Sequence, residues 1–230
     1  MENIKVIFDS LKEFIWDIVG YLIPGSYILI ILSVCIESEY FFSPSFGSNT
    51  SDFSPYAYII ISYLLGYVAY GFGWFKEGVL SEKSYVKKIE ANVGKRKAFV
   101  LSKELLSKAL LAKGIIDDLN NATVRDVRSL AMSYIPEYDQ KIYTFTFRSE
   151  LSNQTANISL IIGTLGLLFS ILKYIPIISN LTVFKTELSY VVLYVFLIIC
   201  YFFLRYSRDR FYAISIGLPF SIYTVKAINS

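Results

Sequence analysis

Basic side chains spaced along one helix face are the residues of this sequence best suited to bind a ligand. Arg125 and Arg128 are three positions apart, so in a helix their guanidinium groups lie on the same side. Guanidinium and ammonium groups bind the phosphates of a nucleotide, an oligonucleotide or a lipid headgroup. A cytosolic segment of a membrane protein is also basic without binding anything, and the sequence alone favours that second interpretation. The candidate ligand-binding residues are Lys87, Lys88, Lys95, Arg96, Arg125, Arg128 and Arg148.

A second polar group, RSELSNQTAN at 148–157, leads into an apolar stretch. In a helix, Arg148, Ser152, Thr155 and Ser159 form one stripe, and Asn153 lies one turn from Asn157. Such a stripe either forms hydrogen bonds between helices or lines a watery path, and both interpretations stay open. If it lines a path, apolar residues deeper in the membrane close that path by dewetting. The candidate pore-lining residues are Asn153, Asn157, Ile161, Leu165 and Leu168.

The residue types of a catalytic or metal site are largely missing. The chain has no histidine and two cysteines, which excludes Ser-His-Asp and Cys-His catalysis, histidine-ligated metals and cysteine-rich clusters. Asp117 and Asp118 begin a DDLNN segment that is similar to the DDxxD of prenyl transferases, but it ends in Asn and has no second copy. We interpret it as a solvated loop. We expect no enzyme activity, no cofactor and no metal.

The elements that must position these residues are membrane helices. Hydrophobic residues make up 54% of the 230 residues and charged residues 18%, against about 45–50% and about 25% in soluble domains. Stretches at 15–36, 55–75, 156–178 and 188–204 have about the length that a bilayer core requires. The sequence therefore predicts an all-α membrane protein with four transmembrane helices, arranged as hairpins at 15–75 and 153–204.

Basic residues predict the orientation of these helices. The 37–54 loop has no lysine or arginine, whereas the 76–152 insert has fourteen and the tail at 205–230 has four. Since basic segments stay in the cytosol, both termini and the insert are predicted to be cytosolic. Residues 1–14 place Ile4, Phe8 and Leu11 on one face, which indicates an amphipathic helix at the cytosolic side.

The insert at 76–152 is predicted to be mainly helical, with helices at 76–92, 95–113 and 124–135. Thr123 and Asp126 have the spacing of a capping box, and Pro136 ends the last helix. From Glu137 a further helix continues into the third span. Alternation of aromatic residues with threonine makes 141–147 a candidate short strand, and alternation of large apolar with small residues makes 212–222 another. We expect the tail to pack against the insert rather than form a fifth span.

This layout resembles the small membrane effectors of bacterial anti-phage systems, and most closely the HalA effectors of Hailong systems. The resemblance rests on YLIPG at 21–25, the basic insert at 76–152 and RSELSNQTAN at 148–157. It implies a homo-oligomeric channel in the bacterial inner membrane, controlled by oligodeoxyadenylates that a partner nucleotidyltransferase makes. No individual binding residue is transferred from the family.

The sequence therefore predicts a homo-oligomeric channel or pore-type effector, with a tetramer among the options, gated through its insert by a nucleotide or short oligonucleotide. Four short helices do not enclose a wide polar path alone, so a pore is expected on a symmetry axis between subunits. The alternative is a membrane adaptor or assembly protein that does not conduct and whose insert binds another protein.

Overall fold

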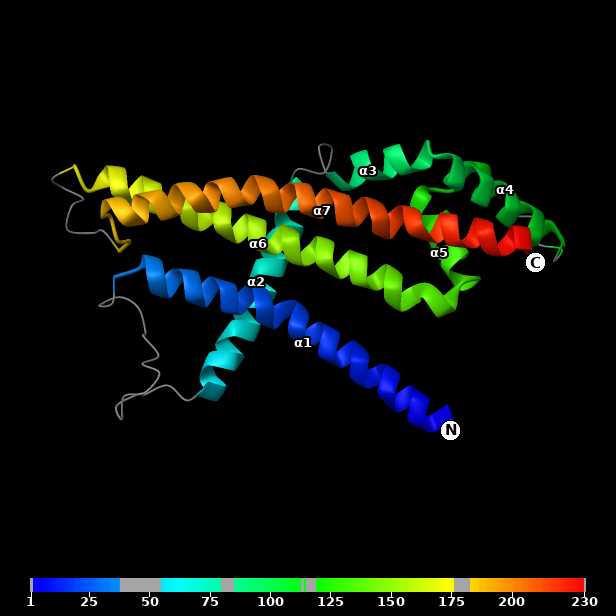
Figure 1. Ribbon diagram of the computed structural model, residues 1–230, viewed down its shortest axis with the longest axis horizontal. Helices are drawn as coiled ribbons and strands as arrows, with labels where there is room; N and C mark the ends of the chain where they lie inside the picture. Colours follow the sequence, from blue (N-terminus) through cyan, green and yellow to red (C-terminus); the bar gives the residue numbers. More distant parts are fainter. Residues whose placement is uncertain are drawn as a thin grey trace. The chain divides into compact units, whose positions relative to one another are not determined.

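The computed structural model describes residues 2–37, 55–79, 85–112, 114, 119–175 and 183–229. The described part of the chain is helical almost throughout (Figure 1) and contains no strand, only an isolated bridge between Ile36 and Phe184. Its elements are α1 (Glu2–Cys35), α2 (Pro55–Val79), α3 (Tyr85–Gly94), α4 (Lys97–Ala112), α5 (Val124–Ser133), α6 (Asp139–Leu172) and α7 (Leu188–Asn229), with short 3-10 turns η2 (Leu119–Asn121) and η3 (Pro136–Tyr138).

The chain divides into two compact units. Unit 1 consists of Met1–Lys76 and Leu151–Arg205, and unit 2 of Glu77–Glu150 and Tyr206–Ser230. Helices α6 and α7 each contribute residues to both units. Unit 2 thus combines the predicted insert with the predicted tail.

Three of the described helices are long and apolar enough to cross a membrane, which indicates a membrane protein. They are Tyr56–Gly73, Pro136–Leu172 and Leu188–Asn229. The described apolar part of α1, Gly20–Cys35, is shorter, so the first of the four predicted spans stays a prediction. The third span was predicted to reach 178, but α6 ends at Leu172, where Lys173 turns back and its Nζ donates to the Thr186 carbonyl at 2.9 Å.

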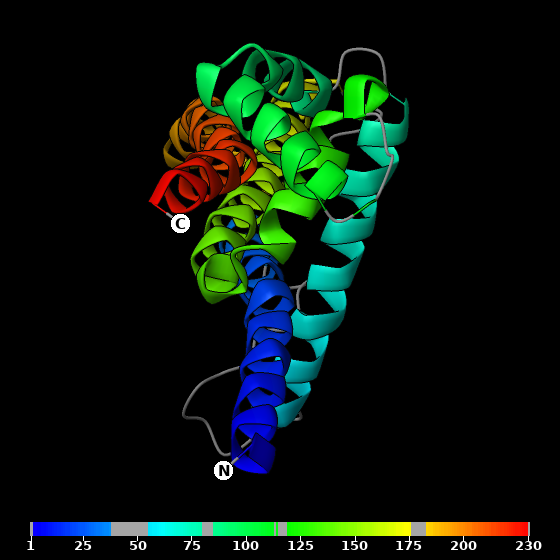
Figure 2. The ribbon, with the colours of Figure 1, turned by 90° about the vertical axis from the view of Figure 1, so that its right-hand side faces the viewer.

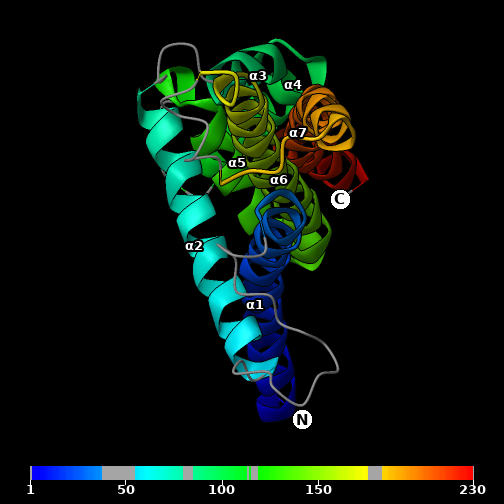
Figure 3. The same ribbon diagram turned by 90° about the vertical axis from the view of Figure 1, so that its left-hand side faces the viewer.

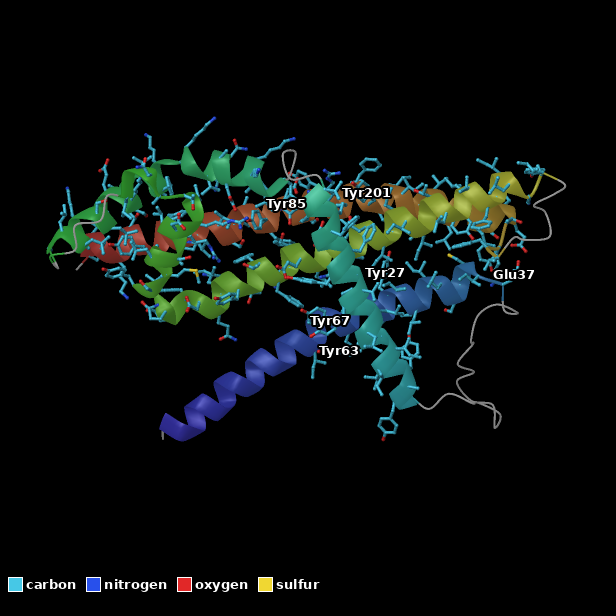
Figure 4. All side chains as sticks on the ribbon, turned by 180° about the vertical axis from the view of Figure 1, so that it is seen from behind. Tyr27, Glu37, Tyr63, Tyr67, Tyr85 and Tyr201 are labelled. Carbon is cyan, nitrogen blue, oxygen red and sulfur yellow. The ribbon has the colours of Figure 1, made fainter. Side chains whose placement is uncertain are left out.

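Helices α1 and α2 cross in unit 1 with their backbones in contact (Figures 1 and 3). A Cβ atom added to Gly25 would collide with the carbonyl of Ser62, and one added to Gly66 with the carbonyl of Tyr21. Around this crossing the Tyr21 ring stacks on the Tyr67 ring, with centroids 3.8 Å apart. Figure 4 shows Tyr63 and Tyr67 on α2 close to α1. Glycine is required here because only a hydrogen atom fits between the helices.

Helices α6 and α7 also pack through small residues in unit 1. Gly163 and Gly166 face Tyr194 and its neighbours on α7, and Tyr194 is fully buried. Its hydroxyl donates to the Lys185 carbonyl at 2.7 Å, which holds the segment before α7. That segment pairs with the end of α1, since the Lys185 N–H donates to the Cys35 carbonyl at 2.8 Å. Cys35 and Cys200 are both free thiols.

Unit 2 is built on one apolar core shared by the insert and the tail. Val93, Leu106 and Val127 from α3, α4 and α5 pack with Phe220 of α7, and Phe99 meets Phe220 edge to face. Ser102 of α4 donates to the Phe220 carbonyl at 2.7 Å. Figure 2 shows α3, α4 and α5 together with the C-terminal end of α7. The expectation that the tail packs against the insert is confirmed.

The predicted helices of the insert are largely confirmed where they are described. The capping box is present, with the Asp126 N–H donating to Thr123 Oγ1 and the Thr123 N–H donating to Asp126 Oδ2. Helix α6 runs unbroken from Asp139 to Leu172, as predicted. Part of the helix predicted at 76–92, the loop around Asp117 and Asp118, and the side chains of the predicted amphipathic helix at 1–14 lie outside the described residues; the described backbone of 2–14 is part of α1.

The candidate strand at 141–147 is wrong, because this segment belongs to α6. The hydroxyl of Thr144 donates to the Gln140 carbonyl at 2.8 Å, one turn earlier in the same helix. Ile142 and Ser149 are buried at helical spacing, whereas Tyr143 is exposed. Because the threonine hydroxyl forms its hydrogen bond within the helix, alternation of threonine with aromatic residues does not distinguish a strand from a helix here.

The candidate strand at 212–222 is also wrong, because α7 continues through it. The buried residues recur in adjacent pairs once per helical turn: Ser215 and Ile216, Pro219 and Phe220, Tyr223 and Thr224. Pro219 has no N–H, so the Ser215 carbonyl lacks its usual helical donor. Arg128 of α5 supplies the replacement, with Nε 3.2 Å from that carbonyl. The helix crosses its proline because another helix satisfies the carbonyl that the proline leaves open.

The α1–α2 crossing generates the first prediction. Gly66→Ala places a methyl group against the Tyr21 backbone and should lower the free energy of unfolding by about 1–3 kcal/mol, the usual cost of overpacking. Gly71→Ala, on the same helix, meets nothing within 4 Å and should stabilise slightly through its higher helix propensity. Thermal unfolding of the detergent-solubilised protein checks both. Equal melting temperatures for the two variants would contradict a backbone contact at Gly66.

Candidate ligand site and candidate pore helix

Arg125 and Arg128, predicted to share an exposed face, have intramolecular partners in unit 2. Arg125 Nε lies 2.6 Å from Glu90 Oε1, and this hydrogen bond raises the pKa of Arg125. Tyr212 of α7 donates to the same Glu90 oxygen at 2.9 Å. Arg128 is half-buried, which lowers its pKa, and it donates to the Ser215 carbonyl. Both arginines therefore hold α5 to α3 and α7 as structural residues.

The other predicted basic residues are spread over unit 2. Lys87 and Lys88 are exposed on α3, and Lys95 is exposed in the turn before α4. The Arg148 guanidinium lies about 6 Å from the ring centroids of Phe145 and Phe211, a distance that permits cation–π attraction. The seven basic residues lie on several elements of unit 2, so their role in binding a ligand stays a prediction.

Arg96 borders a hollow of about 210 Å³ in unit 2. The hollow has an apolar floor, which includes Phe99 and Phe220, and its α7 wall contains Gly217. A Cβ on Gly217 would lie 3.1 Å from Arg96 Nη1, so the guanidinium rests against the α7 backbone because glycine leaves space. Arg96 also directly precedes α4, whose first N–H groups favour anions. A ligand that carries an anionic group on a flat ring could place the anionic group on Arg96 and the ring on the apolar floor of the hollow.

Arg208 is a buried charged residue that the sequence did not single out. It is 2% exposed, its Nε and Nη2 donate to Asp209 Oδ1 at 2.8 and 2.7 Å, and its guanidinium stacks 3.4 Å from the Tyr85 ring centroid. Ser149 of α6 donates to its backbone carbonyl. In the sequence, Arg208 and Asp209 are simply two charged residues of the tail. Nothing in the sequence marks Tyr85 as a partner of Arg208.

The polar stretch of α6 is buried within unit 1 and is only partly satisfied. Asn157 is 4% exposed, and its Oδ1 accepts a hydrogen bond from Lys76 Nζ of α2 at 2.6 Å. Tyr27 of α1 and Ser159 share a hydrogen bond of 2.6 Å. Within the described part of the chain, Asn157 Nδ2 and Gln154 Oε1 are buried without hydrogen-bond partners. The hydrogen bonds to Tyr27 and Lys76 support the interpretation that the stripe joins helices. The unpaired polar atoms support the interpretation that it lines a watery path.

The predicted pore-lining residues of α6 are divided by α2. The polar ones lie beneath α2, since the amide nitrogens of Asn153 and Asn157 face Gly73. The apolar ones, Ile161, Leu165 and Leu168, are exposed further along the helix, whereas the adjacent Ile162 is buried against α7. The stripe therefore passes from a covered polar part to an exposed apolar part.

The described residues contain no group of three or more cysteine, aspartate or glutamate side chains able to hold a metal ion. Comparison with known proteins found no matching family model, no matching curated relative and no matching solved structure.

The Arg128 contact generates the second prediction. Arg128→Met keeps most of the apolar volume but leaves the Ser215 carbonyl without a donor, so unfolding of unit 2 should cost about 1–3 kcal/mol less. Lys88→Met, on the exposed face of α3, should change stability by no more than about 0.5 kcal/mol. Urea unfolding of the solubilised protein separates the two. An Arg128→Met variant as stable as Lys88→Met would refute this role.

Proposed function

We propose that this protein is a homo-oligomeric membrane channel or pore-type effector, gated through its cytosolic insert by a nucleotide or short oligonucleotide in anti-phage defence. The observation that carries the proposal is the composition of α6. This helix is apolar enough to span a membrane, yet among the described residues its Asn157 Nδ2 and Gln154 Oε1 are buried without hydrogen-bond partners. In hydrocarbon such atoms cost free energy unless water or another subunit reaches them.

The exposed stripe of α6 supplies the apolar part of the proposed path. Ile161, Leu165 and Leu168 lie open on a single chain, where another copy of the chain can cover them. Rings of such residues around a symmetry axis close a pore by dewetting. A tetramer is one arrangement that would enclose the path.

The proposed topology has four spans with both termini and unit 2 in the cytosol of a bacterium, in its inner membrane. The distribution of basic residues supports this orientation. The resemblance to Hailong effectors supports the membrane, the oligonucleotide ligand and a partner nucleotidyltransferase as its source.

The ligand is proposed to bind at Arg96 rather than at Arg125 or Arg128, which already have partners. The guanidinium of Arg96 would take a phosphate, and the apolar floor at Phe99 would take a base. Lys95, next to Arg96, adds a second exposed cation.

A membrane adaptor that does not conduct is the second candidate. Helix α4 exposes Val100 and Leu111, which lie on the same face about three turns apart. Exposed large apolar residues outside the spans are typical of protein-binding surfaces. If the channel experiments below fail, this surface is the place to seek a protein partner.

The third prediction concerns the pore. Leu165→Asn on α6 should hydrate the closed constriction and produce ligand-independent ion leakage, because a polar side chain removes the dewetting barrier. Val195→Asn on α7 is the matched control, since the two side chains are 39% and 43% exposed. It should impair insertion without causing leakage. Membrane-potential dyes in cells with matched protein abundance measure both, and equal leakage would remove α6 as the pore lining.

The fourth prediction concerns the ligand. Arg96→Glu should weaken binding of a short oligodeoxyadenylate to the solubilised protein by about tenfold or more, because it replaces a charge-assisted contact with repulsion. Gly217→Leu should weaken binding too, by filling the hollow. Lys88→Glu, an equal charge change on α3, should alter affinity by less than about threefold because screening weakens remote charges. Fluorescence anisotropy gives the affinities; equal losses in all variants would indicate non-specific binding.

A further inference from the structure

The apolar part of α7 ends in a basic segment. Residues 188–204 contain no charged side chain, whereas 205–210 contain three arginines and one aspartate, a net charge of +2. Arg208 is buried, and the other two arginines, Arg205 and Arg210, are exposed. Basic side chains at the end of a membrane helix attract the anionic headgroups of lipids.

Arg205 is held in place by Tyr201, one turn earlier in α7; Figure 4 labels Tyr201 on this helix. Arg205 Nη1 donates to the Tyr201 hydroxyl oxygen at 2.5 Å, and the guanidinium carbon lies 5.7 Å from the centroid of the ring. The contact directs the cation back over the apolar part of the helix, because long helical side chains point towards the N-terminus. The Tyr201 hydroxyl accepts this bond, so its own proton can be donated to a further group.

No carboxylate balances Arg205 among the residues that the structure describes. The nearest acidic residue along α7 is Asp209, one turn later, and it forms its ion pair with Arg208. Glu150 of α6 follows Ser149, whose hydroxyl donates to the Arg208 carbonyl, and Glu150 forms no ion pair with Arg205 either. The guanidinium therefore keeps a positive charge and further N–H groups for a ligand.

An exposed apolar stripe leads up to Arg205 along α7. Val195, Ile199 and Phe202 follow one another at spacings of four and three residues, which places them on one side of the helix. Their side chains are 43%, 46% and 63% exposed. A soluble phosphate would contact Arg205 and leave this α7 stripe uncovered. A phospholipid covers the stripe with an acyl chain while its phosphate reaches the guanidinium.

We propose that Arg205 and Tyr201 bind the phosphate of an anionic phospholipid whose acyl chain lies along the α7 stripe. The phosphate oxygens accept hydrogen bonds from the guanidinium and from the Tyr201 hydroxyl, and the bonds from arginine are charge-assisted. Phosphatidylglycerol, with a net negative charge, fits this site better than phosphatidylcholine, whose choline cation offsets its phosphate. The site requires α7 to cross a membrane and does not require the protein to conduct.

Binding is tested on the full-length protein, solubilised in an uncharged detergent. Its melting temperature is measured while dioleoyl phosphatidylglycerol, dioleoyl phosphatidylcholine or glycerol phosphate is added. A ligand that binds only the folded state raises the melting temperature, so phosphatidylglycerol should raise it more than phosphatidylcholine does. Glycerol phosphate at the same concentration should leave it unchanged. Equal effects of the two lipids, or no effect of either, would overturn the headgroup site, and an equal effect of glycerol phosphate would overturn the lipid as its ligand.

Variants separate a site at Arg205 from general attraction to positive charge. Arg205→Gln should weaken phosphatidylglycerol binding by about tenfold or more, because a charge-assisted bond is lost. Arg210→Gln is the matched control: it removes an equal charge from an exposed arginine about 7.5 Å further along the helix, and should weaken binding by less than about threefold. Tyr201→Phe keeps the ring but removes the hydroxyl, and should give an intermediate loss.

Equal losses in Arg205→Gln and Arg210→Gln would overturn the site, because the lipid would then respond only to net charge. If Arg205→Gln fails to fold, the comparison of Tyr201→Phe with Arg210→Gln decides the question. A Tyr201→Phe variant that binds phosphatidylglycerol as tightly as the wild type would overturn the role of the hydroxyl.

Discussion

Polar groups that are removed from water must find partners within the protein, and this constraint governs both units. In unit 2 it explains how α7 stays helical across Pro219, since Arg128 donates to the carbonyl that the proline leaves open. In unit 1 it explains why Lys76 of α2 donates a hydrogen bond to Asn157 of α6. Asn157 Nδ2 and Gln154 Oε1 do not meet the requirement within the described part of the chain, and they can accept partners such as water or another subunit.

Apolar packing sets how the helices lie against one another, and the polar contacts hold them in that arrangement. Small residues allow the helices of unit 1 to approach closely, as at Gly25 and Gly66, and aromatic rings fill the space beside the crossing. Unit 2 instead has a core of large apolar side chains, with Val93, Leu106 and Phe220 buried at its centre. The two units therefore differ in how their helices pack.

Local signals could be predicted from the sequence, and distant partners could not. The Thr123 capping box, the end of α5 before Pro136 and the helix from Asp139 depend on neighbours in sequence, and they were predicted correctly. The strand prediction at 212–222 was wrong because alternation of large and small residues is typical of a half-buried strand. The Arg128 donor that lets the helix continue through Pro219 lies 87 positions from Ser215 in the sequence. For the same reason, charge and spacing do not reveal that Arg125 bonds to Glu90 and that Arg128 bonds to the Ser215 carbonyl.

The α1–α2 crossing has a consequence for motion. Most helix pairs interlock through side chains, so sliding or rotating one helix requires many rotamers to change together. At Gly25 and Gly66 there are no side chains to interlock, and the backbones touch directly. The Tyr21 ring of α1 packs against Tyr63, Tyr67 and Tyr70 of α2 around this contact. Any rotation of α2 at the crossing therefore requires these tyrosine rings to move together.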